Sequence, residues 1–391
     1  MHKVCLGEVA IEHRETCKEK KDDYPTVGLE HLTPEEVTLT AWDKGSDNTF
    51  TRIFRKGHIL FGRRRAYLKK AVVAPFDGIC SGDITVIEAI PERIFPKLLP
   101  FIIQNDGLFN FAVSKSAGSL SPRVKWEHLQ DYAFTLPPME KQRELAELLW
   151  AMDAVKKSYQ KMLAATDALV KSQFLGLFGL PLRNPMGWIM RPLEDVIDDI
   201  LSGECLNGEQ RVLGPGERAV LKVSAVTYGY FKDDEYKVIF DLGKIKKNVW
   251  PKAGDLLFSR ANTREYVGAT ALVPKDYPDL LLPDKLWKII PSDSITALFL
   301  KYYLSTDEIR NTLSEMATGT SGSMYNISME KLQKLNVFVP PLPLQKQFTA
   351  FVQQVDKSKF AALTCLHQMM RGLLARTGKT SFGASRANHI L

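Results

Sequence analysis

The chain has 391 residues, of which 45% are hydrophobic and 25% charged, and its formal net charge is +7 at pH 7. This composition indicates a globular protein long enough for two or three domains. No apolar run of 18 residues occurs, and the N-terminal stretch lacks a signal-peptide core, so we expect no membrane partner and a cytoplasmic location. The positive charge is compatible with a polyanionic partner but does not by itself indicate one.

The first part of the chain, residues 1–136, mixes short strand-like runs with Gly and Pro breaks. Runs rich in β-branched and aromatic residues occur at 71–75, 84–89 and 132–136. Short strands separated by turn residues predict an α+β domain.

A single long helix is predicted within residues 137–180. No proline occurs from Met139 to Phe178, and only Gly176 interrupts the stretch. Its apolar positions step by three and four residues, as in a heptad coiled coil, so the helix needs a partner helix. The residues expected in this seam are Leu145, Leu148, Met152, Val155, Met162 and Leu169.

The second part repeats this plan. Residues 181–339 are predicted to form a second α+β domain, beginning with a Gly- and Pro-containing linker to about residue 188. A second long helix is predicted over residues 340–377, antiparallel to the first, and residues 378–391 are expected to be a flexible tail. The seam of the second helix comprises Val352, Val355, Leu366, Met369 and Leu373, with Lys359 as its one polar member.

Sequence matches between the two parts indicate an internal duplication. PPMEKQ at 137–142 corresponds to PPLPLQ at 340–345, so that Gln142 and Gln345 each follow a proline pair by four residues. Three further matches occur in the same order: LGEV with LEDV, GHILFGR at 57–63 with GDLLFSR at 254–260, and GSLSPRVKWEHL with GSMYNISMEKL. Matches that keep their order through both halves are the signature of a repeat.

Basic residues concentrate around the repeated GxxLFxR motif in both halves. Each patch alone is as compatible with a solvated surface as with a phosphate contact, but the recurrence favours double-stranded DNA as a partner. The candidate DNA-binding residues are Arg55, Lys56, Arg63, Arg64, Arg65, Lys69 and Lys70 in the first half, and Lys244, Lys246, Lys247, Arg260 and Arg264 in the second.

Two Gly- and Ser-rich loops, at 114–121 and 318–326, are further candidates for phosphate contact. Their Gly residues let the backbone approach a phosphate closely, and their hydroxyl groups can donate to it. Simple connecting turns need the same residue types, so both interpretations stay open. The candidate residues are Ser116, Ser119, Ser321 and Ser323.

With a Pro-Pro-x-x-x-Gln helix following a Gly-Ser loop twice, the chain resembles, over residues 1 to about 376, the specificity subunit of type I restriction-modification systems. The resemblance implies that two recognition domains each read one half of a bipartite, asymmetric DNA target. It also implies that the helices set the spacer between the half-sites and dock two modification subunits, to which restriction subunits are added. S-adenosylmethionine, ATP and Mg are then expected on the partner subunits and no cofactor in this chain. Pro343 and Leu344 depart from the polar residues of the family pattern, so we expect the second helix to start late.

Catalytic motifs are missing from the sequence, which predicts a non-catalytic subunit. NPMG at 184–187 has one proline where an adenine methyltransferase motif has two, and the seven His residues suggest no triad. The five cysteines include no CxxC pair, so we expect no metal site. Two alternatives remain: the recognition portion of a stand-alone DNA-modification system, which should carry catalytic motifs, and a coiled-coil scaffold that binds no DNA.

Overall fold

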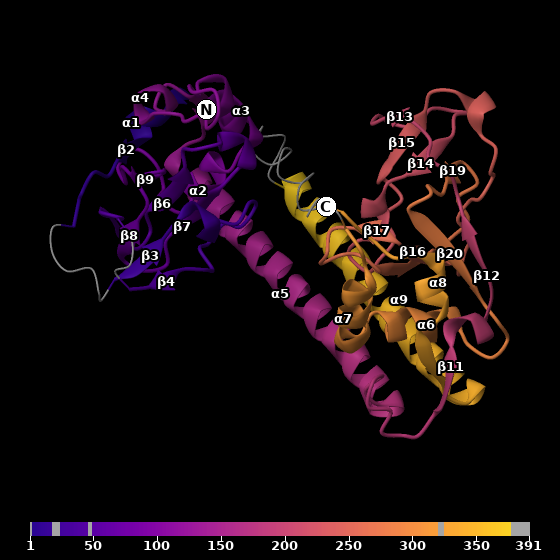
Figure 1. The fold of residues 1–391 in the computed structure, drawn as a ribbon. Helices are drawn as coiled ribbons and strands as arrows, with labels where there is room; N and C mark the ends of the chain where they lie inside the picture. Colours follow the sequence, from indigo (N-terminus) through magenta and orange to yellow (C-terminus); the bar gives the residue numbers. More distant parts are fainter. Residues whose placement is uncertain (1, 18–23, 46–48, 320–323, 377–391) are drawn as a thin grey trace. The chain divides into compact units, whose positions relative to one another are not determined.

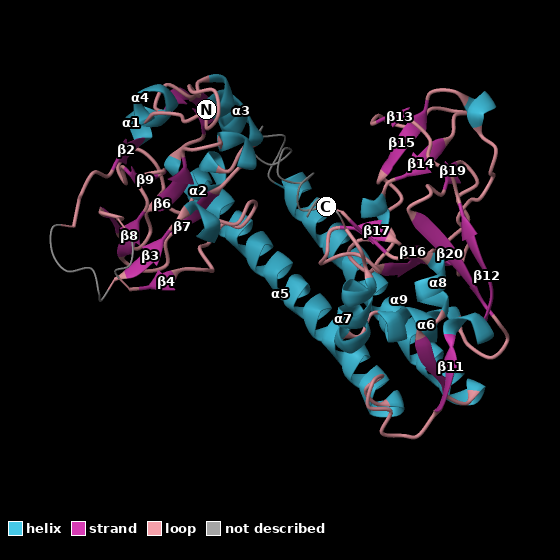
Figure 2. Cartoon of the chain, viewed as in Figure 1, coloured by secondary structure: helices cyan, strands magenta, loops and turns pink. Residues whose placement is uncertain are grey.

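The computed structural model describes residues 2–17, 24–45, 49–319 and 324–376, except for the side chains of Lys244, His367 and residues 370–376. The chain forms two compact units, Met1–Met162 with Phe360–Leu391, and Leu163–Lys359. Both units mix helices with strands (Figures 1 and 2). We call them unit 1 and unit 2 and describe each by itself.

The described residues of unit 1 form two four-stranded sheets and one two-stranded sheet. The first sheet has the antiparallel order β2-β9-β6-β7; the second has the order β4-β3-β8-β5, in which β3 and β8 are parallel; and β1 pairs with β10. The elements are β1 His2–Cys5, α1 Leu6–Val9, β2 Ala10–Glu12, β3 Pro25–Val27, η1 Leu29–His31, β4 Asp43–Lys44, β5 Arg52–Phe54, β6 Ile59–Gly62, η2 Ala66–Leu68, β7 Ala71–Val73, β8 Gly78–Cys80, β9 Ile84–Ala89, α2 Leu99–Ile103, α3 Asp106–Ser114, α4 Trp126–Leu129 and β10 Ala133–Leu136.

Unit 2 repeats this topology. Its sheets have the orders β12-β20-β16-β18 and β13-β15-β14-β19, the latter with β14 and β19 parallel, and β11 pairs with β22 as β1 does with β10. Its elements are β11 Ile189–Pro192, η3 Leu193–Asp195, β12 Ile197–Ser202, β13 Gly208–Glu209, β14 Ala219–Leu221, η4 Val223–Ala225, β15 Tyr236–Ile239, η5 Leu242–Lys244, β16 Leu256–Ser259, β17 Ala261–Asn262, β18 Thr270–Leu272, β19 Leu280–Leu281, β20 Leu286–Pro291, α6 Ala297–Leu304, α7 Asp307–Met316, β21 Tyr325–Asn326, α8 Met329–Gln333 and β22 Asn336–Val339.

The repeated GxxLFxR motif forms the central strand β6 in unit 1 and β16 in unit 2. Successive side chains of a strand point to opposite faces of the sheet. Ile59 and Phe61 join the core cluster that includes α2 and α3, whereas Leu60 joins a second cluster with the other sheet. Leu256 and Phe258 face the helices of unit 2 in the same way, and Leu257 faces the second sheet. The ILF and LLF runs are therefore apolar throughout because both faces are buried.

The two long helices are α5, Met139–Phe178, and α9, Leu342–Arg376. The expectation of a late start for the second helix is wrong: α9 begins at Leu342, with Pro343 as its second residue. Proline is tolerated there because the first amides of a helix have no intrahelical acceptor to lose. The two helices run antiparallel in unit 2, because Asp167 contacts Lys359 while Phe174, further along α5, contacts Phe348, which precedes Lys359 on α9.

The glutamine of each Pro-Pro-x-x-x-Gln motif is buried and fixes the start of its helix. Gln142 donates from Nε2 to the Pro137 carbonyl (2.9 Å) and accepts the Phe95 amide hydrogen at Oε1 (2.8 Å). Gln345 donates to the Pro340 carbonyl (2.9 Å) and accepts from the Thr296 amide (2.8 Å). Each glutamine thus joins the helix start to the loop that precedes α2 in unit 1 or α6 in unit 2.

The predicted heptad seam is only partly buried. Leu145, Met152, Val352 and Leu366 are buried, and Leu148, Val155 and Val355 are half-buried against the same core clusters. Met162, Leu169 and Met369 are exposed, so their assignment to the seam is wrong, and the Leu373 side chain lies outside the described residues.

Toward the end of α5 the buried positions are Val170, Phe174 and Phe178. A straight helix has 3.6 residues per turn, so its buried face drifts by about 20° per heptad away from a strict 3.5 repeat. The drift explains why Val170 is buried where the heptad pattern predicts Leu169. The extended apolar stripe lets the end of α5 pack against the domain core, where Phe174 contacts Phe299.

Candidate nucleic-acid interface

Each unit brings its basic motif and its Gly-Ser loop together by the same backbone hydrogen bonds. In unit 1, the Ala117 and Arg123 amides donate to each other's carbonyls (3.0 and 2.9 Å) and the Val124 amide donates to the Arg63 carbonyl (3.0 Å). We call residues 117–123 the first hairpin loop. The basic motif and the Gly-Ser loop, which lie far apart in the sequence, therefore form one structural feature.

In unit 2, the same set of backbone hydrogen bonds closes the segment between Thr318 and Asn326, which we call the second hairpin loop. The Thr318 and Asn326 amides donate to each other's carbonyls, both at 2.9 Å, and the Ile327 amide donates to the Arg260 carbonyl at 2.9 Å. Ser321 and Ser323 lie outside the described residues.

The turn before the central strand is also built alike in both copies. Gly57 and Gly254 have φ values of +91° and +83°, which side-chain-bearing residues rarely adopt. One residue later, His58 Nδ1 accepts the Arg55 amide hydrogen (3.1 Å), and Asp255 accepts that of Lys252 (2.6 Å). The basic residues at the turn are thus held by a local cap.

Four of the seven candidate basic side chains in unit 1 have partners within the unit. Arg55 pairs with Glu15 (2.5 Å) and Asp77 (3.3 Å), and Lys69 pairs with Asp106 (2.5 Å). Lys70 donates to the Leu29 carbonyl, and Arg64 pairs with Asp83 (3.4 Å) and donates to Ser121 Oγ (3.0 and 3.2 Å). These four side chains stabilise the fold around the loop.

Two of the other three are available to an external anion. Lys56 and Arg65 are exposed, and within the described part of the chain neither forms an ion pair. Arg63 is half-buried, and its buried Nε has no hydrogen-bond partner among the described residues. Arg65 has a left-handed backbone (φ 54°), and its amide donates to the Pro122 carbonyl of the first hairpin loop (2.8 Å).

In unit 2 the candidates divide in the same way. Arg260 donates to the carbonyl and carboxylate of Asp284 (2.8 and 3.1 Å) and lies over Trp287. The guanidinium of Arg264 lies over the Tyr325 ring at 5.7 Å. Lys246 and Lys247 have exposed side chains, and the Lys244 side chain lies outside the described residues.

The serine candidates of the first loop differ from each other. Ser116 donates to the Ala112 carbonyl at the end of α3 (2.8 Å), whereas Ser119 is exposed. Sequence reasoning missed Arg123, which pairs with Asp83 at 2.7 Å. Arg123 foremost, with Arg64, holds the pKa of the Asp83 carboxyl below its ordinary value. The charged Asp83 therefore joins the strand motif to the first hairpin loop.

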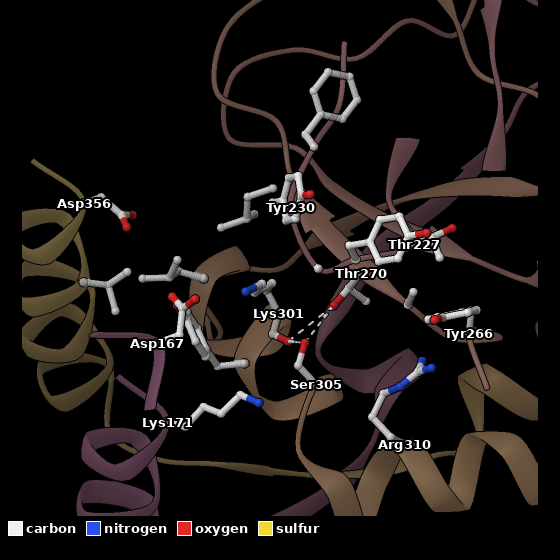
Figure 3. A pocket seen from close by; sticks show the side chains of 18 of the residues that line it. Asp167, Lys171, Thr227, Tyr230, Tyr266, Thr270, Lys301, Ser305, Arg310 and Asp356 are labelled. Atoms are coloured by element: carbon white, nitrogen blue, oxygen red, sulfur yellow. Dashed lines mark hydrogen bonds between the residues drawn. The ribbon is translucent and has the colours of Figure 1, made fainter. Parts of the chain in front are cut away.

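A cavity of about 900 Å³ lies in unit 2 (Figure 3). Lys301 is half-buried with its ammonium 4.1 Å from the centre of the Tyr302 ring, and burial lowers the pKa of Lys301 to about 8. Asp167 and Asp356 line the same cavity. Because acids and bases are mixed around it, the cavity does not have the charge of a phosphate site.

His13, His58 and Glu88 gather in unit 1 with their ligand-type atoms within 4.8 Å of one another. Because His58 Nδ1 accepts the Arg55 amide hydrogen, its own proton lies on Nε2, where a metal would have to bind. Asp255 occupies the corresponding place in unit 2 and caps the same turn. Burial lowers the pKa of His58 and keeps the ring neutral. We therefore interpret His58 as the cap of the turn that begins at Arg55, and not as a metal ligand.

The family model for the type I restriction modification DNA specificity domain matches residues 1–163 and 185–365. The chain belongs to this family. The two matched ranges correspond to the two copies of the repeat and confirm the duplication. No helix within the described residues is long and apolar enough to cross a membrane.

Curated relatives of this specificity-domain protein include specificity subunits from Escherichia coli. The specificity subunit of the type I restriction enzyme EcoKI is 23% identical over 312 residues, which cover 73% of this chain and 66% of the relative. That of EcoEI is 25% identical over 182 residues, 45% of this chain and 30% of the relative. The matched regions thus span less than two thirds of these relatives.

Solved structures support the fold. A type I restriction-modification S subunit from M. genitalium aligns over 98% of this chain and 95% of its own length, with a TM-score of 0.53 and 12% identity. A chain from a type I system studied for complex assembly and conformational transition covers 97% of this chain and 96% of its own length, with a TM-score of 0.50 and 20% identity.

Proposed function

We propose that this chain is the DNA-recognition subunit of a type I restriction-modification complex, and that each unit reads one half of a bipartite, asymmetric target. The observation that carries the proposal is the repeated junction between basic motif and hairpin loop. The backbone hydrogen bonds that close this junction are the same in both units, but its side chains differ, such as Arg64 and Pro122 in one copy against Ala261 and Tyr325 in the other. A common scaffold with different side chains suits two related half-sites of different sequence.

The long helices are the proposed dock for two modification subunits, and restriction subunits join that complex. Support comes from the family membership and from relatives that are named as subunits of restriction enzymes. We place S-adenosylmethionine, ATP and Mg on those partners, because the sequence offers no catalytic motif of its own. A stand-alone modification system and a DNA-free scaffold are not favoured, because the family model and the named relatives are those of specificity subunits.

The salt dependence of DNA affinity tests the interface. The target is first identified by mapping methylated adenines in cells that co-express the chain with its modification subunits. Each phosphate contact contributes about 0.9 to the slope of log affinity against log salt. Lys56→Ala and Arg65→Ala should each reduce that slope by about one, because both cations are exposed and without an ion pair among the described residues.

Lys334→Ala is the matched control, since Lys334 is exposed directly after α8 and pairs with Glu330 outside the basic motif. It should leave the slope unchanged. If Arg65→Ala binds as the wild type does at every salt concentration, the first interface is misplaced. A wild-type chain whose affinity does not fall with salt would favour the scaffold.

A further inference from the structure

The turn that follows the central strand carries an arginine and a tyrosine in both units. It reads RAYL at 65–68 and REYV at 264–267. Strand pairing gives the same match, because Val73 in β7 and Leu272 in β18 each pair with the third residue of the GxxLFxR motif. The arginine precedes that paired residue by eight positions and the tyrosine by six in both copies. We call these two segments the Arg-x-Tyr turns.

Each Arg-x-Tyr turn lies beside the hairpin loop of its unit. The Arg65 amide donates to the Pro122 carbonyl (2.8 Å), and the guanidinium of Arg264 lies 5.7 Å from the centre of the Tyr325 ring. Both arginine side chains are exposed, and neither forms an ion pair with another described residue. The turns are therefore continuous with the junction that carries the proposed function.

The first turn is held in place from inside the unit. Ala66 is buried, and Lys69, which follows the turn, pairs with Asp106 at the start of α3. Lys69 has a left-handed backbone (φ 53°), as Gly268 has after the second turn (φ 80°). The Tyr67 side chain is nevertheless 54% exposed, so it contributes little to this packing. One exposed aromatic residue is ordinary, but an arginine and a tyrosine that recur together point to a contact outside the chain.

The surroundings of Tyr67 favour a phosphate over an apolar partner. Eight basic residues and no acidic one occur from Arg52 to Lys70. Arginine and tyrosine side chains both donate hydrogen bonds to phosphate oxygens. Because the two residues are two positions apart on one turn, they can donate to the same phosphate or to adjacent ones.

The second turn differs in the surroundings of its tyrosine. Glu265 stands where unit 1 has Ala66, and its charge raises the pKa of Tyr266. The Tyr266 ring also packs edge-on against Tyr228, with 5.8 Å between the ring centres. The Tyr266 hydroxyl thus has a carboxylate acceptor beside it, so we expect it to contribute less to phosphate binding than Tyr67 does.

We propose that the Arg-x-Tyr turn of each unit binds the sugar–phosphate backbone of its half-site, with the hydroxyl groups of Tyr67 and Tyr266 donating to phosphate oxygens beside the arginines. Such contacts fix the position of a unit on the duplex and carry no base preference. The inference rests on the proposed function and adds to it the side chains that position each unit, as distinct from those that read bases.

The test measures the affinity of the complex of full-length chain and modification subunits for the mapped target and for unrelated DNA of equal length. Tyr67→Phe should lower both affinities roughly tenfold, because a hydrogen bond to a charged group is lost. The ratio of the two affinities and the salt slope should stay as in the wild type, because the lost hydroxyl is uncharged. Tyr266→Phe should lower both affinities about threefold. Tyr230→Phe, which alters a tyrosine of similar exposure (56%) outside both turns, is the control.

Methylphosphonate substitution in the DNA locates the contact, because it removes the charge of one phosphate at a time. At one position in the half-site of unit 1, the substitution should lower the affinity of the wild type more than that of Tyr67→Phe. Equal losses at every position would contradict a phosphate contact by Tyr67.

The outcomes separate this inference from the proposed function. If the wild type does not prefer its target, both fall. If it does, but Tyr67→Phe binds both DNAs as Tyr230→Phe does, the inference alone is wrong. A loss confined to the target would make Tyr67 a base contact, and weakened association with the modification subunits at unchanged DNA affinity would make it a protein contact. Either result overturns the inference.

Discussion

Burial disfavours the charged form of Lys301 in unit 2. Its ammonium lies over the Tyr302 ring, and loss of hydration lowers the pKa of Lys301 from 10.5 to about 8, although Asp167 and Asp356 act in the opposite direction. Because the folded pKa lies below the unfolded one, the unfolded chain binds the proton more tightly. Stability is therefore lost as the pH falls from 10.5 to about 8, and the full cost of roughly 3 kcal/mol applies at neutral pH.

Lys301→Met should raise the free energy of unfolding by about 2 kcal/mol at pH 7, since the lost cation–π contact offsets part of the gain. The gain should shrink as the pH rises from 8 to 10.5. Urea unfolding across that range measures it, with Lys171→Met, an exposed lysine at the same cavity, as the control. A variant no more stable than wild type at pH 7 would show that Lys301 is adequately solvated.

Single basic residues also show what sequence reasoning could not reach. The sequence pattern located the basic motif that contacts the hairpin loop. It could not show that Lys69 forms an ion pair within the unit, whereas Arg65 forms none among the described residues. Lys69 is neutralised by Asp106, which lies 37 residues away in the sequence, and Arg64 by Asp83, 19 residues away. Which cation remains available to a phosphate therefore depends on tertiary pairing, which local charge density does not encode.

Among the helices and strands, α5 shows how far the spacing of apolar residues predicts which side chains are buried. Its existence and its bounds from Met139 to Phe178 follow from proline placement, and the duplicated strands follow from repeated motifs. The heptad pattern does not predict that Leu169 is exposed and Val170 buried. The 3.6-residue period of the helix drifts away from the heptad over its 40 residues, and the domain core determines which face is covered.

The start of each long helix depends on its buried glutamine. Gln142→Leu leaves the Phe95 amide and the Pro137 carbonyl without their side-chain partner, and Gln345→Leu does the same to Thr296 and Pro340. Each variant should lose about 2 to 4 kcal/mol of stability, because an unsatisfied buried polar group costs about 1–3 kcal/mol.

Hydrogen exchange measures this effect locally. In Gln142→Leu, the Phe95 amide and the first turn of α5 should exchange faster, whereas the first turn of α9 should not change. Gln160→Leu replaces an exposed glutamine of α5 and should alter neither site. Protection equal to wild type at Phe95 would mean that the glutamine bond is dispensable.

At the scale of the whole molecule, we propose that the two long helices also set the length of the unread spacer between the half-sites. The chain passes from one compact unit to the other within these helices, between Met162 and Leu163 in α5 and between Lys359 and Phe360 in α9. Seven residues make nearly two helical turns, so inserting seven at each point preserves the buried faces and adds roughly 10 Å. Ten base pairs of DNA span about 34 Å, so the insertion corresponds to about three base pairs.

The variant with both insertions should therefore methylate sites whose unread spacer is longer by about three base pairs, while both half-sites keep their bases. Mapping of methylated adenines in cells that co-express the modification subunits measures spacer and half-sites together. The same seven residues added after Leu391 lengthen neither helix between the units and should leave the target unchanged. The insertions leave the basic motifs and hairpin loops untouched. Altered bases in either half-site would therefore contradict the proposal that the units read the bases and the helices set only the spacer. An unchanged spacer with full methylation would show that the helices do not set the distance.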